Sequence, residues 1–414
     1  MTADATQELT IDRLGGEGDG IAQGAGGPVY VPFALAGDRV RVSGKRIDII
    51  EATGHKTPVC QHFTQCGGCV AQHMPDDVYI AWKQGLVTQA FRQRGIVADI
   101  QPLRRVAAQS RRRAVLTATR VGSGTDASVL LGFHGRGNHT LIDLAECPVL
   151  SPAIVKALPA IREVATLVLS RRGEGRITVT ACDNGLSVAI VGGRDDLDVD
   201  ARHKIALTAQ AAKLAHLTLD GQLLASQGAP LLTLGLAKVT PPPSVFLQAV
   251  PEAEAHMVAL VTAAVGRAKR VVDLFSGLGT FTLPLAVTAK TVLAVDSDKE
   301  ALAALAEATR NAQGLRPITT KLRDLMREPL ARKELDEFDA AVFDPPRAGA
   351  SSQAEWLAKS KVPVVVAVSC NPVTLARDAE ILIAGGYKIG AVTPIDQFLY
   401  SAHVEVVAVF KRTK

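Results

Sequence analysis

The most constraining feature of the sequence is the alternation of strand-like and helix-like segments after about residue 270. Apolar runs with the length and composition of buried strands occur at 271–275, 291–296, 318–324, 339–344 and 362–369. Amphipathic helical patterns, such as 299–313 and 371–385, lie between them. This alternation predicts a doubly wound α/β sheet, in which ligands bind beyond the carboxyl ends of the strands. The last two runs, 387–395 and 403–412, have no helix between them, so we expect an antiparallel far edge.

The earlier part of the chain is organised differently. Short alternating runs with glycine turns between Glu8 and Ala52 indicate a small β unit of the oligonucleotide-binding type. A helical pattern at 78–94 precedes several strand-like runs, which predict a mostly antiparallel sheet with a few helices. Three prolines at 241–243 mark a boundary. We therefore expect a small β-barrel at 1–55, a central α+β part at 56–240 and a Rossmann-like part at 241–414.

Composition narrows the class of protein. Of the 414 residues, 47% are hydrophobic and 21% are charged, which is typical of a folded chain. No apolar run reaches the length of a membrane span and the N-terminus has no secretory pattern, so we expect a cytoplasmic protein without membrane contact. We also expect a monomer. The net charge of +5 is only mildly basic. A local cluster of arginines can neutralise phosphates or form a solvated face: Arg104, Arg105, Arg111, Arg112 and Arg113.

A glycine-rich turn after the first C-terminal strand indicates a nucleotide site. Gly277 and Gly279 allow the backbone to approach a ligand closely, and Asp296 ends the second strand, where its carboxylate can bind ribose hydroxyls. An NAD site would share this turn, but no third glycine follows, which favours S-adenosylmethionine. Asp324, at the end of the third strand, is either an adenine contact or an exposed loop acid.

Three side chains with reactive potential follow later strands. Asp344 begins a Asp-Pro-Pro-Arg turn, and Cys370 stands before a helix whose N-terminus favours a thiolate. Glu405 interrupts an apolar run, either as a general base or as an edge residue facing water. A cysteine, a base and a methyl donor in one crevice suit methylation at C5 of uracil, because thiolate addition to C6 activates C5. Cys370 can instead be a buried, inert cysteine.

The remaining cysteine pattern points to a metal centre. Cys60, Cys66 and Cys69 lie close together in sequence, and Cys147 stands alone much later. Four thiolates in this arrangement suit a [4Fe–4S] cluster, and zinc is the main rival. Zinc sites more often pair two C-x-x-C units, so the spacing favours the cluster.

These motifs together resemble the RNA 5-methyluridine methyltransferases, in the iron–sulfur branch that includes 23S rRNA enzymes. The resemblance extends over nearly the whole chain, from an N-terminal segment similar to a TRAM domain to the motifs at 273–286, 343–349, 369–378 and 403–407. It implies that Cys370 is the nucleophile and Glu405 the base. It implies a [4Fe–4S] cluster on the four cysteines, and cofactor contacts from Gln248, Phe275, Gly277, Thr280, Asp296, Asp324 and Asp344.

The chain departs from the family pattern at a few positions. Val250 and Thr280 stand where asparagine is usual, Asp296 where glutamate is usual, and Leu399 where proline is usual. Replacing glutamate by aspartate preserves a carboxylate for the ribose. The first two departures affect only local contacts.

The resemblance leaves the RNA open. We expect 23S rRNA, because the cluster-bearing branch is mostly ribosomal, and tRNA is the nearest alternative. An amine-directed methyltransferase would need the Asp344 turn and leave Cys370 idle. A non-catalytic iron–sulfur RNA-binding protein would need neither Cys370 nor Glu405.

Overall fold

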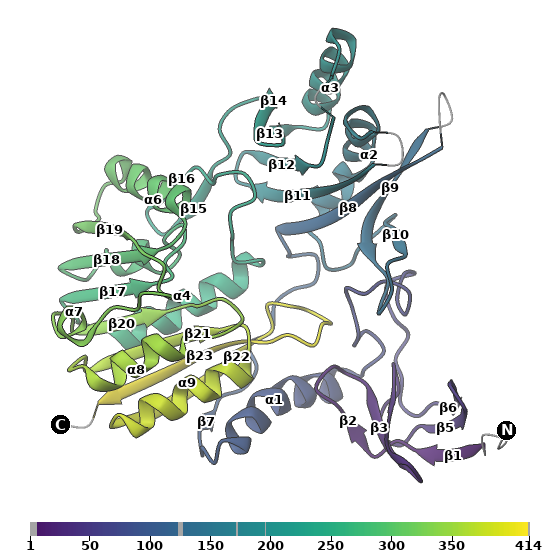
Figure 1. Ribbon diagram of the computed structural model, residues 1–414, viewed down its shortest axis with the longest axis horizontal. Helices are drawn as coiled ribbons and strands as arrows, with labels where there is room; N and C mark the ends of the chain where they lie inside the picture. The colour runs from purple at the N-terminus through teal and green to yellow at the C-terminus, as the bar shows by residue number, and fades with distance from the viewer. Residues whose placement is uncertain (1–5, 123–126, 171–172, 195, 413–414) are drawn as a thin grey trace.

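The computed structural model describes residues 6–122, 127–170, 173–194 and 196–412. Its chain forms three regions around a common centre, visible in Figure 1 as purple N-terminal sheets, a teal central sheet and a green-to-yellow C-terminal sheet. No helix in these described ranges has the length and apolar character required to cross a bilayer.

The N-terminal region consists of two small three-stranded sheets. One has the order β1-β5-β6 and the other β2-β3-β4, and every strand pair in them is antiparallel. The strands are β1 (Gln7–Thr10), β2 (Arg13–Leu14), β3 (Gly20–Gly24), β4 (Gly27–Val31), β5 (Arg39–Ser43) and β6 (Arg46–Glu51). The sheets share a small core that includes Ile11 and Ala34, and Gly20 lies so close to both that a Cβ there would collide with them. The predicted small β unit is therefore present, as two packed sheets.

The central region is a seven-stranded sheet with the order β10-β9-β8-β11-β12-β13-β14. Among the described strands of this sheet, only β12 and β13 pair in parallel, as expected for a mostly antiparallel sheet. Its strands are β8 (Arg113–Val121), β9 (Ser128–His134), β10 (Leu141–Asp143), β11 (Glu174–Cys182), β12 (Gly185–Val191), β13 (Leu214–Leu219) and β14 (Gln222–Ser226). Helices α2 (Pro152–Val168) and α3 (Val199–Ala211) bury apolar residues against it.

The C-terminal region is an eight-stranded sheet with the order β19-β18-β17-β20-β21-β23-β22-β7. The predicted strands are all present: β17 (Arg270–Leu274), β18 (Thr291–Asp296), β19 (Ile318–Leu322), β20 (Ala340–Phe343), β21 (Val364–Ser369), β22 (Tyr387–Ile395) and β23 (Glu405–Arg412). The first five in the sheet order are parallel, and β23 pairs antiparallel with β21 and β22. β22 and β23 form the predicted antiparallel pair, but β22 does not end the sheet. The two-residue β7 (Asp99–Ile100) pairs with it in parallel.

Helices cover both faces of this sheet. One face carries α1 (Asp76–Gln93), α7 (Arg332–Leu335), α8 (Ser351–Lys359) and α9 (Pro372–Ala384). The other carries α4 (Pro251–Val265) and α5 (Thr282–Leu285), while α6 (Lys299–Asn311) packs with the hairpin of β15 (Leu232–Leu234) and β16 (Ala237–Val239). Both α1 and β7 come from the stretch that the sequence assigns to the central part, yet they pack on the C-terminal sheet (Figure 1).

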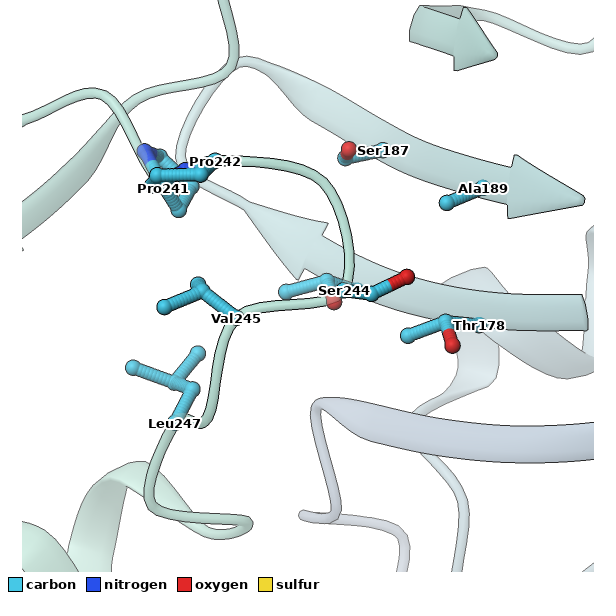
Figure 2. Close-up of a pocket in the computed structure, with 9 residues that line it drawn as sticks. Thr178, Ser187, Ala189, Pro241, Pro242, Ser244, Val245 and Leu247 are labelled. Atoms are coloured by element: carbon cyan, nitrogen blue, oxygen red, sulfur yellow. The ribbon is translucent and has the colours of Figure 1, made fainter. Parts of the chain in front are cut away.

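A proline-rich linker joins the central and C-terminal regions. Pro242, Ser244 and Val245 line a cavity of only about 10 Å³ together with Thr178 of β11 and Ser187 of β12. Figure 2 shows the linker passing beside these two strands. The linker therefore lies directly on the central sheet, and it leads into Gln248 just before α4.

Candidate active site

The sequence of β21 and α9 places Cys370 at a strand-to-helix junction. β21 ends at Ser369, and the Asn371 side chain caps α9 by accepting a hydrogen bond from the Val373 N–H (3.1 Å). The Asn371 amide also donates to the Arg347 carbonyl oxygen (3.1 Å), which ties this junction to the Asp-Pro-Pro-Arg turn. Cys370 is partly exposed at the carboxyl edge of the sheet, as predicted.

Sheet pairing brings Glu405 to the same edge. Ser369 is the Cα partner of Val406 in the antiparallel β21–β23 pair, so Glu405 begins its strand beside Cys370. The Glu405 side chain is only 2% exposed, which excludes the alternative of an edge residue facing water. Asp344 follows the neighbouring strand β20, and its carboxylate is close enough to raise the pKa values of both Glu405 and Cys370.

Two glutamine side chains connect these carboxylates. The Gln397 Nε2 donates to Glu405 Oε2 (3.0 Å) and to Gln248 Oε1 (2.8 Å). The Gln248 Nε2 in turn donates to Asp344 Oδ2 (2.8 Å). Gln397 is a site residue that the sequence analysis missed, because it lies in a loop without a periodic pattern.

Electrostatics at this site differ from the sequence expectation. Burial, followed by the charges of Glu405 and Asp344, raises the pKa of Cys370 to about 11, so the resting group is a thiol. The predicted preference for a thiolate is therefore wrong, because burial, together with the two carboxylates, outweighs the helix terminus. Burial and Asp344 raise the pKa of Glu405 well above its ordinary value, and burial raises that of Asp344 to about 7.

A cavity of about 290 Å³ opens beside Cys370. Arg347, Asn371 and His403 line it from the C-terminal region, and Glu17 lines it from the N-terminal sheets. Helix α1 supplies the remaining wall. A molecule bound in this cavity could therefore contact the Cys370 thiol, helix α1 and the N-terminal sheets at the same time.

The glycine turn after β17 adopts the conformation that a close backbone approach requires. Gly277 and Gly279 have φ values of 51° and 90°, and a Cβ on Gly279 would lie 2.5 Å from Leu305. Phe275 also has a positive φ (62°), a conformation that is rare for an aromatic residue and occurs mostly at functional sites. The Asp296 carboxylate accepts from the Gly277 N–H (2.8 Å), which fixes the turn against β18.

The other two predicted cofactor residues, Thr280 and Asp324, differ in their distance along the chain from the glycine turn and in their exposure. Thr280 lies in the same turn and is partly exposed. Asp324 lies beyond the end of β19 as an exposed loop acid, and it caps its own turn by accepting hydrogen bonds from the Met326 and Arg327 N–H groups. Asp273, which received no role from the sequence, is fully buried beneath the turn, and burial raises its pKa to about 7.

The arginine cluster does not act as one surface. Arg112 is 8% exposed and donates to the Glu254 carboxylate (2.6 Å) and to the Gln248 carbonyl oxygen (3.1 Å). Neither of the two alternatives from the sequence, a phosphate contact or a solvated face, fits Arg112, because its charge is already paired in the interior. Arg105 is paired with Asp76 (3.1 Å), and Arg111 lines a different cavity.

That second cavity contains the four clustered cysteines. Cys60, Cys66, Cys69 and Cys147 all line one space of about 180 Å³. Burial raises the pKa of Cys69 to about 12, and the thiols of the group raise one another's pKa. Within the described residues, no three His, Cys, Asp or Glu side chains are arranged to hold a single metal ion.

Comparison with known proteins identifies the family. The family model described as tRNA (uracil-5-)-methyltransferase matches residues 241–413. A Brucella suis protein described as an uncharacterized RNA methyltransferase is 46% identical, with 100% of this chain and 99% of that protein covered. A 23S rRNA (uracil(1939)-C(5))-methyltransferase from Halomonas elongata is 31% identical, with 97% and 89% covered. The chain belongs to the RNA 5-methyluridine methyltransferase family.

As a member of this family, the chain is an S-adenosylmethionine-dependent RNA (uracil-C5)-methyltransferase, as the sequence predicts. The solved structure of a Pyrococcus abyssi tRNA (uracil-54, C5)-methyltransferase in complex with S-adenosyl-L-homocysteine has the same fold. It superposes with a TM-score of 0.75 and 20% identity, over 98% of this chain and 100% of that one. The amine-directed and non-catalytic alternatives therefore fall away.

Proposed function

We propose that this methyltransferase modifies C5 of a uridine in 23S rRNA through a covalent bond between Cys370 and C6 of the base. The observation that carries this proposal is the convergence of the Cys370 thiol, the buried Glu405 carboxylate and Asp344 at one edge of the sheet. The Halomonas relative, similar over nearly its whole length, supports the choice of 23S rRNA. The Pyrococcus enzyme shows only that the fold also serves tRNA.

The cofactor residues fit S-adenosylmethionine. The glycine turn, the Asp296 carboxylate and the Gln248–Asp344 pair lie at the carboxyl ends of three neighbouring strands, β17, β18 and β20. When bound there, S-adenosylmethionine supplies the methyl group and a positive sulfonium, which favours the thiolate of Cys370 over the thiol. Asp296 would hold the ribose, with Phe275, Gly277, Thr280, Asp324 and Asp344 around the rest of the molecule.

The reaction then follows from the positions of two side chains. Cys370 Sγ bonds to C6 of the uracil, which gives C5 the electron density to take the methyl group as the donor's carbon–sulfur bond breaks. Glu405 removes the C5 proton, the C5–C6 double bond re-forms, and the Cys370 thiolate leaves. The raised pKa makes the ionised Glu405 carboxylate a stronger base for the C5 proton than an ordinary glutamate.

The 290 Å³ cavity beside Cys370 is the proposed entry for the target nucleotide. A base inside a duplex stack cannot reach the thiol, so the nucleotide must be turned out of its stack. Arg347 on one wall can pair with a phosphate, and the N-terminal sheets border the opposite wall. This arrangement supports an RNA-binding role for residues 1–55 as a TRAM-like domain.

The proposed covalent bond is tested with Glu405→Gln. Without the base, the adduct forms but the C5 proton stays, so a protein–RNA complex should survive denaturing gel electrophoresis. The control is the double variant Glu405→Gln/Cys370→Ala, which should give no such complex. Absence of the adduct in Glu405→Gln, together with near-normal turnover, rules out Glu405 as the base.

The choice of RNA is tested in cells that lack the protein. Mass spectrometry should find one 5-methyluridine missing from 23S rRNA and none missing from tRNA. Loss of the modification from tRNA alone would replace the ribosomal assignment by the tRNA alternative.

We further propose that the four cysteines bind a [4Fe–4S] cluster. The support for this proposal is that all four cysteines line one shared cavity, and four cysteine thiolates are the usual ligands of such a cluster. The cavity wall is largely apolar, and the Gly68 N–H donates to Cys66 Sγ (3.4 Å), as is common for cluster ligands. When bound, the cluster would favour the thiolates that burial now disfavours. An anaerobic preparation should be brown with about four irons per chain; a colourless, zinc-loaded protein would refute the cluster.

A further inference from the structure

The loop between β22 and β23, residues 396–404, is held unusually firmly at its base. Asp396 and Lys83 are both fully buried and form an ion pair (3.0 Å). Tyr79 donates to the Asp396 carboxylate (2.8 Å), and the Lys83 ammonium also donates to the carbonyl oxygens of Phe398 and His403. Helix α1 therefore fixes both ends of a loop that has no regular secondary structure of its own.

Backbone contacts fix the middle of the same loop. The Tyr400 N–H donates to the Tyr79 hydroxyl (3.0 Å), and the Tyr400 carbonyl oxygen accepts from the N–H groups of Val70 and Ala71. Contacts at the start, the middle and the end of the loop therefore hold its backbone in one position. Gln397 is the residue of this loop that donates hydrogen bonds to Glu405 and Gln248.

The Gln397 side chain occupies a position with only one favourable orientation. It is 2% exposed, and its two amide hydrogens meet a carboxylate oxygen of Glu405 and the amide oxygen of Gln248. Rotating the amide by half a turn would set its oxygen against both of these acceptors. Because the Gln397 nitrogen lies between two acceptors, each hydrogen bond in the series Glu405–Gln397–Gln248–Asp344 has a fixed donor and a fixed acceptor.

We propose that Gln397 is a positioning residue for removal of the C5 proton: its amide fixes the Glu405 carboxylate and, through Gln248, links the base to the cofactor side of the site. The inference rests on the proposed function, because it takes Glu405 as the base. Gln397 itself exchanges no proton and forms no bond with the substrate in this proposal. It acts by keeping one carboxylate oxygen occupied and leaving the other to face C5.

The charges around Glu405 determine the direction of the expected pH effect. Asp344 faces it from the end of β20, Cys370 from the end of β21 and Gln397 from the loop, while Arg347 lies beyond Cys370. Burial and Asp344 raise the pKa of Glu405, whereas the Gln397 hydrogen bond lowers it. Removing the amide donor therefore raises the pKa further, so a higher pH is needed to keep the base ionised.

The test is Gln397→Met, which keeps the length of the side chain and removes both donors. RNA carrying tritium at C5 of the target uridine reports proton removal, and labelled methyl donor reports methyl transfer. Tritium release should slow by about 10- to 100-fold, with methylated adduct accumulating, and the acidic limb of the pH–rate profile should move up by about one pH unit. Gln397→Leu should behave alike, so failure of one variant to fold leaves the test intact.

Gln353→Met is the matched control. Gln353 is 1% exposed and makes two hydrogen bonds with Leu330, away from the site. This variant should lower the melting temperature without changing the pH profile or the amount of adduct. If the Gln397 variants bind the methyl donor normally and release tritium at the wild-type rate with an unshifted profile, the positioning role is wrong. If Glu405→Gln also traps no adduct, the proposed function itself fails.

Discussion

The molecule contains two partly buried groups of reactive side chains, and they are built in opposite ways. The side chains at the active site come from the ends of neighbouring strands and are joined by hydrogen bonds from Glu405 through Gln397 and Gln248 to Asp344. The four cysteines come from irregular segments at 60–69 and around Cys147 and share a cavity. Hydrogen bonds within the fold hold the first group together, whereas the second is the site of the proposed cluster. Variants in the two groups should therefore separate activity from stability.

The largest expected effect is that of Cys370→Ala. Without the nucleophile C5 is not activated, so methyl transfer should fall by at least about 10⁴-fold. Binding of S-adenosylmethionine, measured by calorimetry, should stay within about twofold because no cofactor contact is removed. The iron content should equal that of the wild type. Retained methyl transfer would show that Cys370 is not the nucleophile. The side chains around Cys370 would then not be the catalytic group.

Removing a clustered cysteine should produce the reverse pattern. We expect Cys66→Ala to lose most bound iron and about 4 kcal/mol of unfolding free energy, because cluster binding stabilises the folded loops. Cys182→Ala is the matched control, since Cys182 is also partly buried but lies outside the cavity, on β11. Equal iron content and equal stability in the two variants would show that the cysteine cavity does not depend on a cluster.

The same contrast explains how much the sequence could predict. Cys370, Asp344 and Asp296 follow strands that the apolar pattern identifies, and parallel strands end at one edge, so their meeting could be expected. Gln397 and Lys83 could not be found this way, because their roles depend on a loop and a helix that are far apart in sequence. The same is true of β7, whose two residues carry no detectable pattern.

The electrostatic error has a related cause. The sequence places Cys370 at a helix N-terminus, which by itself favours a thiolate. It does not show that Glu405 and Asp344 lie close enough to raise the pKa of the thiol. Likewise, Arg112 looks like a phosphate ligand until its pairing with Glu254 is known. Local patterns predicted positions well, but charges depend on neighbours from other strands.

The buried acid beneath the glycine turn, Asp273, should make the stability of the protein depend on pH. Burial raises the pKa of Asp273 from 3.8 to about 7, with the Thr282 hydroxyl donating to its carboxylate (2.5 Å). The raised pKa means that the stability due to this group is present below pH 4 and is lost as the pH rises through 7. Between pH 4 and pH 8, the wild type should lose roughly 3 kcal/mol more unfolding free energy than Asp273→Asn. Parallel stability curves would show that Asp273 is not held protonated.

The smallest expected effect is that of replacing Asp296, the proposed ribose acceptor at the end of β18. Asp296 accepts hydrogen bonds from the N–H groups of Gly277 and Asp298 (both 2.8 Å), so its carboxylate is in position before any ligand arrives. Asp296→Ala should raise the Kd for S-adenosylmethionine about tenfold, because the ribose loses a charged acceptor and the glycine turn loses its tether. Asp296→Glu keeps the carboxylate and should stay within about threefold of the wild type. Asp298→Ala is the control: it removes the cap of α6 and should cost about 1 kcal/mol of stability without changing the Kd. If Asp296→Ala bound S-adenosylmethionine as tightly as the wild type, Asp296 would not be the ribose acceptor. The cofactor side of the site would then not be preformed in the way that separates it from the cysteine cavity.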